Sequence, residues 1–372
     1  MFADAVRMKA YEEALLRVVT PNTTVLDIGA GAGIMSLIAC RLGAARVWAI
    51  EPNEAIQVGR DLAVANGFGD RIQFFHQESA RVELPGRAEV IVSDLRGLLP
   101  LTPYHIPAIV DARRRFLAPG GVLIGKRDTL WAAPVEAPGH HAASIGPWEA
   151  RPHVLDLRAG QRIVTNRVLA GTNLAGPLRL LAPPVSWGTL DYATVESPDV
   201  AAAFDAQAER AGMAHGLLLW FDAELAEGIS FSNAPDKPEL VWGRMFLPLS
   251  GPVPVAAGDV FRIALDARLI GDEYLFRWDT RVAAPGQPPK ADFRQSTFHG
   301  NPVTLESLRR ESAAYIPVID DDVRIDRLVL SLIDGMNSLA EIAERVQEAF
   351  PARFPGRREA LARVSRISGR WS

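Results

Sequence analysis

The feature that most constrains the fold is a glycine-rich loop between a short apolar strand and a helix. Residues 25–34 read Val-Leu-Asp-Ile-Gly-Ala-Gly-Ala-Gly-Ile, so Gly29, Gly31 and Gly33 follow the strand directly. Glycine allows such a loop to turn tightly and allows a ligand to lie against its backbone. Strands and helices continue to alternate to about residue 124, which predicts a doubly wound parallel α/β sheet.

Two acidic residues beside this loop indicate the class of ligand. Glu51 ends the next strand, where a carboxylate accepts hydrogen bonds from both hydroxyls of a ribose. Asp27 suits the cationic, amine-bearing end of S-adenosylmethionine and would repel a pyrophosphate. The G-x-G-x-G spacing also differs from the G-x-G-x-x-G of dinucleotide sites. The sequence therefore predicts S-adenosylmethionine as cofactor, and a nicotinamide-dependent oxidoreductase is the disfavoured alternative.

The remaining chain predicts two further domains. Short apolar strands separated by Pro and Gly recur between residues 216 and 282, which indicates a β-sandwich or barrel. Helix-forming sequence follows, with Ser338 and Glu341 spaced as a capping box. We expect an S-adenosylmethionine-binding domain over residues 1–130, a β-barrel substrate domain over 131–303 and a small helical, winged-helix-like domain over 304–372.

Composition excludes several classes of function. A net charge of −4 provides no general attraction to nucleic acid or to an anionic membrane. No apolar run approaches the ~18–20 residues that cross a bilayer, and the N-terminus lacks the pattern of a signal peptide. Cys40 is the only cysteine, so neither an internal disulfide nor a thiolate metal cluster can form. We expect a cytoplasmic protein without a bound metal and without a nucleic-acid or membrane partner.

With these motifs in place, the chain up to about residue 281 resembles the protein arginine methyltransferases. Residues 25–34 resemble the first motif of that family, and Glu51 falls on its ribose-binding carboxylate. The resemblance implies that Arg7, within the opening Met-Phe-Ala-Asp-Ala-Val-Arg, holds the cofactor's carboxylate. It also implies that Glu78 and Ser79 contact adenine.

The later part of the chain is similar to the barrel of the same family. The stretch Leu-Trp-Phe-Asp-Ala-Glu-Leu over residues 219–225 carries this likeness, and residues 149–168 resemble a shortened dimerisation arm. The resemblance therefore implies a homodimer.

The chain departs from this family where the family binds arginine. The family's guanidinium clamp is a hairpin with two glutamates, and residues 93–103 correspond to it. Asp94 retains the first carboxylate, Pro103 replaces the second, and Arg96 lies between them. Trp242 retains the ring of the Thr-His-Trp loop, whose histidine is lost. We expect Asp94 to act in catalysis, Trp242 to wall the pocket, and arginine to be a poor substrate because a guanidinium requires a bidentate carboxylate partner.

Several alternatives remain open at this point. A shift in loop register would bring Tyr104 or His105 to the site, although a satisfied surface role is the simpler interpretation of His105. The residues after 304 are similar to peptide-binding modules of ribosomal-peptide biosynthesis, which add a peptide strand to a sheet edge, but a plain helical appendage explains them equally well.

The sequence predicts a methyltransferase that N-methylates a peptide or a small molecule. The alternatives are a binding protein on this scaffold without catalysis and a true arginine N-methyltransferase with a rebuilt clamp.

Overall fold

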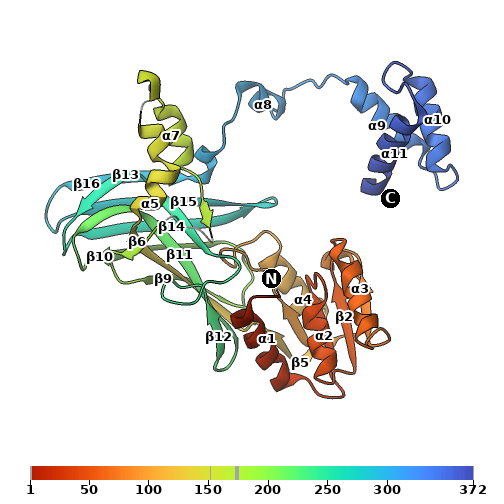
Figure 1. Cartoon of the computed structure of the whole chain (residues 1–372), viewed down its shortest axis with the longest axis horizontal. Coiled ribbons are helices and arrows are strands. Elements are labelled where there is room, and N and C mark those ends of the chain that lie inside the picture. Colours follow the sequence, from red (N-terminus) through yellow and green to blue (C-terminus); the bar gives the residue numbers. More distant parts are fainter. Residues whose placement is uncertain (1, 151, 172–175, 372) are drawn as a thin grey trace. The chain divides into compact units, whose positions relative to one another are not determined.

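The chain folds into two compact units, Met1–Pro302 and Val303–Ser372. The computed structural model describes residues 2–150, 152–171 and 176–371. The first unit contains an α/β part, drawn in red to orange in Figure 1, and a β-rich part drawn in yellow to cyan. Strand β5 ends at Ile124 and β6 begins at Arg127 in a different sheet, so the two parts of this unit meet there.

The α/β part is built on a five-stranded parallel sheet in the order β3-β2-β1-β4-β5, as predicted. Its elements are α1 (Ala5–Val18), β1 (Thr24–Ile28), α2 (Ile34–Arg41), β2 (Arg46–Ile50), α3 (Ala55–Ala65), β3 (Ile72–Phe75), η1 (Ser79–Arg81), β4 (Ala88–Ser93), α4 (His105–Arg115) and β5 (Leu117–Ile124).

Alternation along the strands explains why helices cover both faces of this sheet. In β1, Val25 packs into the cluster that includes α1 and α2, whereas Leu26 and Ile28 pack into the cluster that includes α4. Strands buried on both faces are apolar throughout, as this one is except for Asp27. Because the strands are parallel, the glycine loop after β1 and Glu51 after β2 lie at the same edge of the sheet.

The β-rich part confirms the predicted barrel region and adds strands that the sequence pattern did not reveal. Its antiparallel strands form a four-stranded sheet, β10-β14-β15-β16, and a larger sheet along β7-β13-β11-β6-β8, to which β9 and β12 are attached. The strands are β6 (Arg127–Glu136), β7 (Leu169–Gly171), β8 (Arg179–Leu180), β9 (Val185–Asp191), β10 (Val200–Gln207), β11 (Gly212–Ala226), β12 (Ile229–Ser232), β13 (Arg244–Val255), β14 (Val260–Ile270), β15 (Glu273–Ala283) and β16 (Pro289–Ser296).

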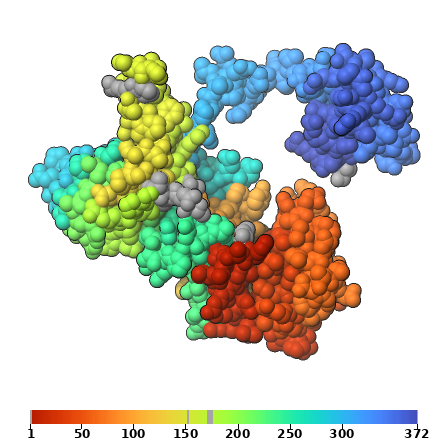
Figure 2. Space-filling model, viewed as in Figure 1, coloured from red at the N-terminus to blue at the C-terminus, as the bar shows by residue number. Residues whose placement is uncertain are grey.

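Helix α1 joins the two parts of the first unit. It packs on α2 and β5 of the α/β part and on β11 and β12 of the barrel. Figure 2 shows it in dark red beside the orange domain and the green barrel strands. Asp4 caps its N-terminus by accepting a hydrogen bond from Arg7 N (3.2 Å), and the other oxygen of Asp4 accepts one from Val241 N (3.0 Å). The first turn of α1 is thereby fixed to the loop that contains Trp242.

The predicted dimerisation arm is a short helical excursion from the barrel. Residues 149–168, predicted as this arm, contain η2 (Pro152–Val154) and α7 (Arg158–Val164). Helices α5 (Pro138–Ser144) and α6 (Gly146–Glu149) precede these elements, and η3 (Thr297–Gly300) follows the barrel. Residue 151 of the arm lies outside the described residues. Val154 is 94% exposed and Leu155 is 57% exposed, so the arm presents apolar side chains to solvent. The homodimer stays a prediction.

The second unit is helical, with α8 (Leu305–Arg310), α9 (Asp321–Leu332), α10 (Leu339–Ala349) and α11 (Arg357–Trp371). The capping box between Ser338 and Glu341 is confirmed. Ile342 and Val346 are buried in the core of this unit, whereas Leu339, in the first turn of α10, is 40% exposed.

The described residues of the second unit, 303–371, contain no strand. These residues therefore lack the wing of a winged helix. They also offer no sheet edge to which a peptide strand could be added, contrary to the expectation from the sequence. Among the described residues of the whole chain, no helix is long and apolar enough to span a membrane.

Candidate functional site

The glycine loop adopts a backbone conformation that residues other than glycine rarely take. The φ angles of Gly29, Gly31 and Gly33 are 71°, 55° and 74°. A Cβ atom at Gly29 would also collide with the side chain of Leu95. The loop therefore needs glycine both for its backbone and for its close approach to the segment after β4.

A cavity of about 470 Å³ opens beside this loop, at the carboxyl ends of β1 and β2. This volume lies within the range of small-molecule sites. Glu51 lies at its edge, with Oε2 accepting from Gly31 N (2.8 Å) and Oε1 accepting from Asn53 N (2.8 Å). The cavity is lined by Ile28, Gly29, Ile50, Glu51, Pro52, Glu78, Ser79, Ala80, Leu95, Tyr104, Pro107, Ala108 and Asp111. Apolar walls with a few carboxylates and a hydroxyl fit an adenosine group, and Gly29, Glu51, Glu78 and Ser79 are brought together as predicted from the sequence.

Asp27 lies behind the loop and does not line the cavity. Its Oδ2 accepts hydrogen bonds from Ser36 N (3.0 Å) and Ser36 Oγ (2.7 Å), so this carboxylate fastens α2 to β1. Burial raises the pKa of Asp27 to about 7, although the two bonds from Ser36 oppose the shift. Its contact with the cofactor's amine stays a prediction.

Three residues predicted from different parts of the sequence meet in a second group. Arg7 of α1 forms an ion pair with Asp94, which follows β4, and both side chains are almost completely buried. The Arg7 guanidinium also lies 5.3 Å from the ring centroid of Trp242, in the loop between β12 and β13. The structure therefore brings together Arg7, predicted to hold the cofactor's carboxylate, and Asp94, predicted to act in catalysis. The ring of Trp242, predicted to line the pocket, lies against the Arg7 guanidinium.

Asp94 retains one oxygen for a further partner. Its Oδ1 is buried and has no hydrogen bond among the described residues; the nearest cation there is Arg96 Nη1, at 3.7 Å. Burial raises the pKa of the Asp94 carboxyl above its usual value, even though the guanidinium groups of Arg96 and Arg7 act in the opposite direction. A carboxylate with a raised pKa and a free acceptor atom is suited to receiving a proton.

Arg96 is at the centre of a fully buried polar network. Its Nε and Nη2 donate to Oδ2 and Oδ1 of Asp128 (2.7 and 2.9 Å), and its Nη1 donates to Tyr11 Oη (2.8 Å). Tyr192 Oη donates to Asp128 Oδ2 (2.5 Å) and lies 2.7 Å from His105 Nε2. The network thus joins α1, α4 and the segment after β4 to the barrel.

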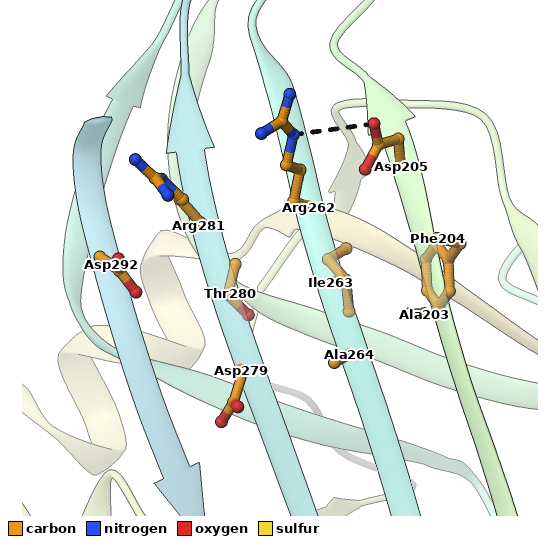
Figure 3. Close-up of a pocket in the computed structure, with 10 residues that line it drawn as sticks. All are labelled: Ala203, Phe204, Asp205, Arg262, Ile263, Ala264, Asp279, Thr280, Arg281 and Asp292. Atoms are coloured by element: carbon orange, nitrogen blue, oxygen red, sulfur yellow. Dashed lines mark ion pairs between the residues drawn. The ribbon is translucent and has the colours of Figure 1, made fainter. Parts of the chain in front are cut away.

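A different hollow, of about 510 Å³, lies on the outer face of the sheet β10-β14-β15-β16 (Figure 3). Asp205, Arg262, Arg281 and Asp292 form a row across its four strands. Asp279 also lines the hollow, and Arg262 Nε lies 3.8 Å from Asp205 Oδ2. No residue predicted for the site lines it, so the candidate site is the cavity at the glycine loop and the group around Asp94.

Comparison with known proteins agrees with this geometry over both parts of the first unit. Residues 126–268 match the family model of the arginine methyltransferase oligomerization subdomain, and residues 8–124 match that of the ribosomal protein L11 methyltransferase. The chain is a protein arginine methyltransferase-like class I methyltransferase. Its cofactor is S-adenosylmethionine.

Individual relatives of this methyltransferase are distant in sequence. Protein arginine N-methyltransferase 6 of Xenopus laevis is 26% identical over 275 residues, which cover 68% of this chain and 78% of that protein. The arginine N(omega)-methyltransferase of Streptomyces achromogenes subsp. streptozoticus is 29% identical over 279 residues, covering 71% of this chain and 74% of that protein.

Solved structures share the fold of the methyltransferase. Protein arginine methyltransferase 10 of Arabidopsis thaliana has a TM-score of 0.69 at 21% identity, and covers 80% of this chain and 95% of its own. The Trypanosoma brucei PRMT1 enzyme-prozyme heterotetrameric complex with AdoHcy has a TM-score of 0.71 at 19% identity, with the same coverage.

The structure corrects two expectations about the segment after β4. His105 is not a surface histidine: it is fully buried, and burial together with the charge of Arg96 lowers its pKa well below the usual value. Tyr104 lines the cavity at the glycine loop instead of the site at Asp94. Arg96, which the sequence places between Asp94 and Pro103, forms an ion pair with Asp128 of the barrel. Pro103 lies in the turn before α4. Because proline has no carboxylate, this position supplies no second acid.

Sequence reasoning missed Asp128 and Tyr192, which complete the network from the barrel. Asp128 stands in the charged stretch Lys126-Arg127-Asp128 at the start of β6, and Tyr192 follows the end of β9. In one sequence, a buried acid in such a stretch cannot be distinguished from a solvated one. The apolar run from residue 130 was the only signal that a strand begins there.

The raised pKa of Asp27 predicts how stability depends on pH. Between pH 3.8 and about 7 the folded protein binds more protons at Asp27 than the unfolded chain does, so stability falls as pH rises. We expect wild type to lose about 2–3 kcal/mol through this group between pH 5 and pH 8. Asp27→Asn retains an acceptor for Ser36 and should lack this decline. Urea unfolding of both proteins at the two pH values measures it, and equal pH slopes would contradict it.

Proposed function

We propose that this methyltransferase N-methylates a neutral or weakly basic acceptor group on a peptide or small molecule, and that the acceptor is oriented by Asp94. Two features support the proposal. The segment after β4 supplies one carboxylate where a guanidinium clamp needs two. Asp94 is also the buried acid that pairs with Arg7, whose guanidinium lies over the ring of Trp242, and its neighbour Leu95 lines the cavity at the glycine loop.

The observation that carries the proposal is the free acceptor atom of Asp94. Oδ1 is buried and without a hydrogen bond among the described residues. Its ion-pair partner, Arg96 Nη1, lies 3.7 Å away. A buried oxygen that receives no hydrogen bond is incompletely satisfied, so it suits a ligand group that donates to it. An acceptor N–H is a group of this kind.

Each residue of the site has a role in this proposal. S-adenosylmethionine supplies an electrophilic methyl group on a positively charged sulfur. Glu51 holds the ribose, and Arg7 holds the carboxylate end, which separates Arg7 from Asp94. Asp94 then accepts the hydrogen bond of the acceptor N–H and takes up its proton, while Trp242 excludes water and limits the motion of the acceptor.

Three further parts of the proposal rest on the sequence. The second unit binds the peptide that carries the acceptor, through its helices; the exposed Met336 and Trp371 there leave apolar surface for a partner. The chain forms a homodimer through the arm, and it acts in the cytoplasm. Catalysis is favoured over a binding role without chemistry, because the glycine loop, Glu51 and Asp94 are all in place.

Binding of the cofactor is tested with Glu51→Ala. The variant leaves ribose hydroxyls without a charged acceptor, so we expect S-adenosylmethionine affinity to fall by about 1.5–3 kcal/mol, which is roughly ten- to a hundredfold. Isothermal titration calorimetry measures it, with Glu54→Ala as a control, since that exposed glutamate is three residues away and makes no side-chain cap bond. Unchanged affinity in Glu51→Ala, or tight binding of NAD by wild type, would contradict the assignment.

A further inference from the structure

The surroundings of Arg96 have the composition of a binding site for a guanidinium ion. Asp128 contacts it through two parallel hydrogen bonds, and Asp94 Oδ1 lies 3.7 Å away. The rings of Tyr192 and Phe231 lie 5.6 and 5.9 Å from its central carbon. Bidentate carboxylates and aromatic faces are the partners that recognise a guanidinium group.

We propose that Arg96 is a built-in occupant of a guanidinium site, and that it determines specificity by excluding arginine side chains from Asp94. This inference rests on the proposed function, because it takes Asp94 to be the acceptor's partner. Arg96 is a positioning and specificity residue in this view: it acts through the charge and space that it occupies, and it does not contact the reacting atoms.

The charges around Asp94 explain the exclusion. Arg7 contacts Asp94 and also Asp4, at 3.9 Å, whereas Arg96 contacts Asp128 and, at 3.7 Å, Asp94. Asp94 and Asp128 each already face a guanidinium. When Arg7 moves to the cofactor's carboxylate, Asp94 still faces Arg96. A guanidinium acceptor would then bring a second buried cation to one carboxylate, and an incompletely paired buried charge is strongly unfavourable. A neutral N–H donor meets no such repulsion.

The network also explains why the Arg96 side chain cannot move out of the site. Its side chain is 1% exposed, and a Cβ atom on Gly125 would already come within contact distance of its Nη2. Tyr11 and Asp128 accept hydrogen bonds from its guanidinium, and the ring of Tyr192 lies 5.6 Å from its central carbon. Tyr192 is in turn held by Asp128 and His105. The guanidinium therefore stays in place during turnover, so the exclusion is permanent.

Arg96→Ala tests the inference without cofactor or acceptor. It leaves an empty guanidinium-shaped space facing Asp128, so we expect methylguanidinium chloride at millimolar concentration to raise the thermal stability of this variant and not that of wild type. N-acetylarginine methylamide should bind to it at least about tenfold more tightly than to wild type. Arg281→Met, on the outer sheet face of Figure 3, is the matched control and should respond like wild type.

If Arg96→Ala does not fold, a second variant still tests the inference. Arg96→Met with Asp128→Asn replaces the ion pair by a neutral pair of similar size, which buried sites tolerate well. It should show no methylguanidinium stabilisation, yet bind N-acetylarginine methylamide about fivefold more tightly than wild type, because Asp94 no longer faces Arg96.

Two outcomes would overturn the inference. One is equal binding of N-acetylarginine methylamide by wild type and both variants. The other is that wild type methylates arginine-containing peptides faster than arginine-free ones. Failure to bind S-adenosylmethionine would instead overturn the proposed function, and the stability measurement on Arg96→Ala would remain valid.

Discussion

Asp94→Asn is expected to lower kcat by about 10²–10⁴-fold, the usual contribution of a positioned acid or base. Asparagine has nearly the same shape and can still accept a hydrogen bond from the acceptor, but it cannot take up the proton. The fall should therefore appear in kcat more than in KM. The measurement is release of S-adenosylhomocysteine with an acceptor identified by mass from a panel of arginine-containing and arginine-free peptides.

The pH dependence of the same reaction provides an independent check. Asp94 accepts a proton only as a carboxylate, so activity should be lost as pH falls through its pKa. Burial raises that pKa, which moves the acid limb of the profile to higher pH than an ordinary aspartate would produce. The limb should disappear in Asp94→Asn and persist in Asp272→Asn, a change at an exposed position between β14 and β15. Wild-type kcat in Asp94→Asn would contradict the role of this carboxylate.

Asp128→Ala is expected to reduce the free energy of unfolding by about 3–5 kcal/mol, because it leaves the buried charge of Arg96 without its main partner. Tyr192 also loses the carboxylate to which it donates. Urea unfolding followed by tryptophan fluorescence measures the effect.

The control for this prediction is an exposed ion pair on the barrel. Asp279 pairs with Arg277, whose side chain is 56% exposed, and Asp279→Ala should cost no more than about 1 kcal/mol. A similar loss in both variants would show that the Arg96–Asp128 pair is not special. Combining Asp128→Asn with Arg96→Met should recover most of the stability, since no unpaired charge then remains.

The cofactor cavity was predictable from the sequence because its signal is local. Gly29, Gly31 and Gly33 need positive φ angles within a few residues of a buried strand, and Glu51 ends the strand that pairs with it. A parallel sheet brings such strand ends together by topology alone. The Arg96 network was not predictable in the same way. Its members come from residues 11 to 192, and only the packed barrel determines that Asp128 is buried.

The missed strands have equally physical causes. β10 reads Val-Ala-Ala-Ala-Phe-Asp-Ala-Gln, and alanine carries little strand preference. β16 begins with Pro and Lys and alternates polar residues. Both lie at the edges of their sheet, where polar and proline residues are tolerated because one side of the strand is unpaired. Central strands such as β14 had clear apolar alternation and were predicted.

The position of helix α1 has a consequence for the order in which a newly made chain becomes competent. Its residues Arg7 and Tyr11 are synthesised before the barrel, but their partners there are Trp242 and Phe231. At about 5–20 residues per second, roughly 12–47 s separate the synthesis of residue 7 from that of residue 242. The residues that line the cavity at the glycine loop extend to Asp111, and the sheet that holds them ends at Ile124. If the cavity binds the cofactor and Asp94 orients the acceptor, as proposed, we expect a nascent chain to bind nucleoside before methyl transfer can begin.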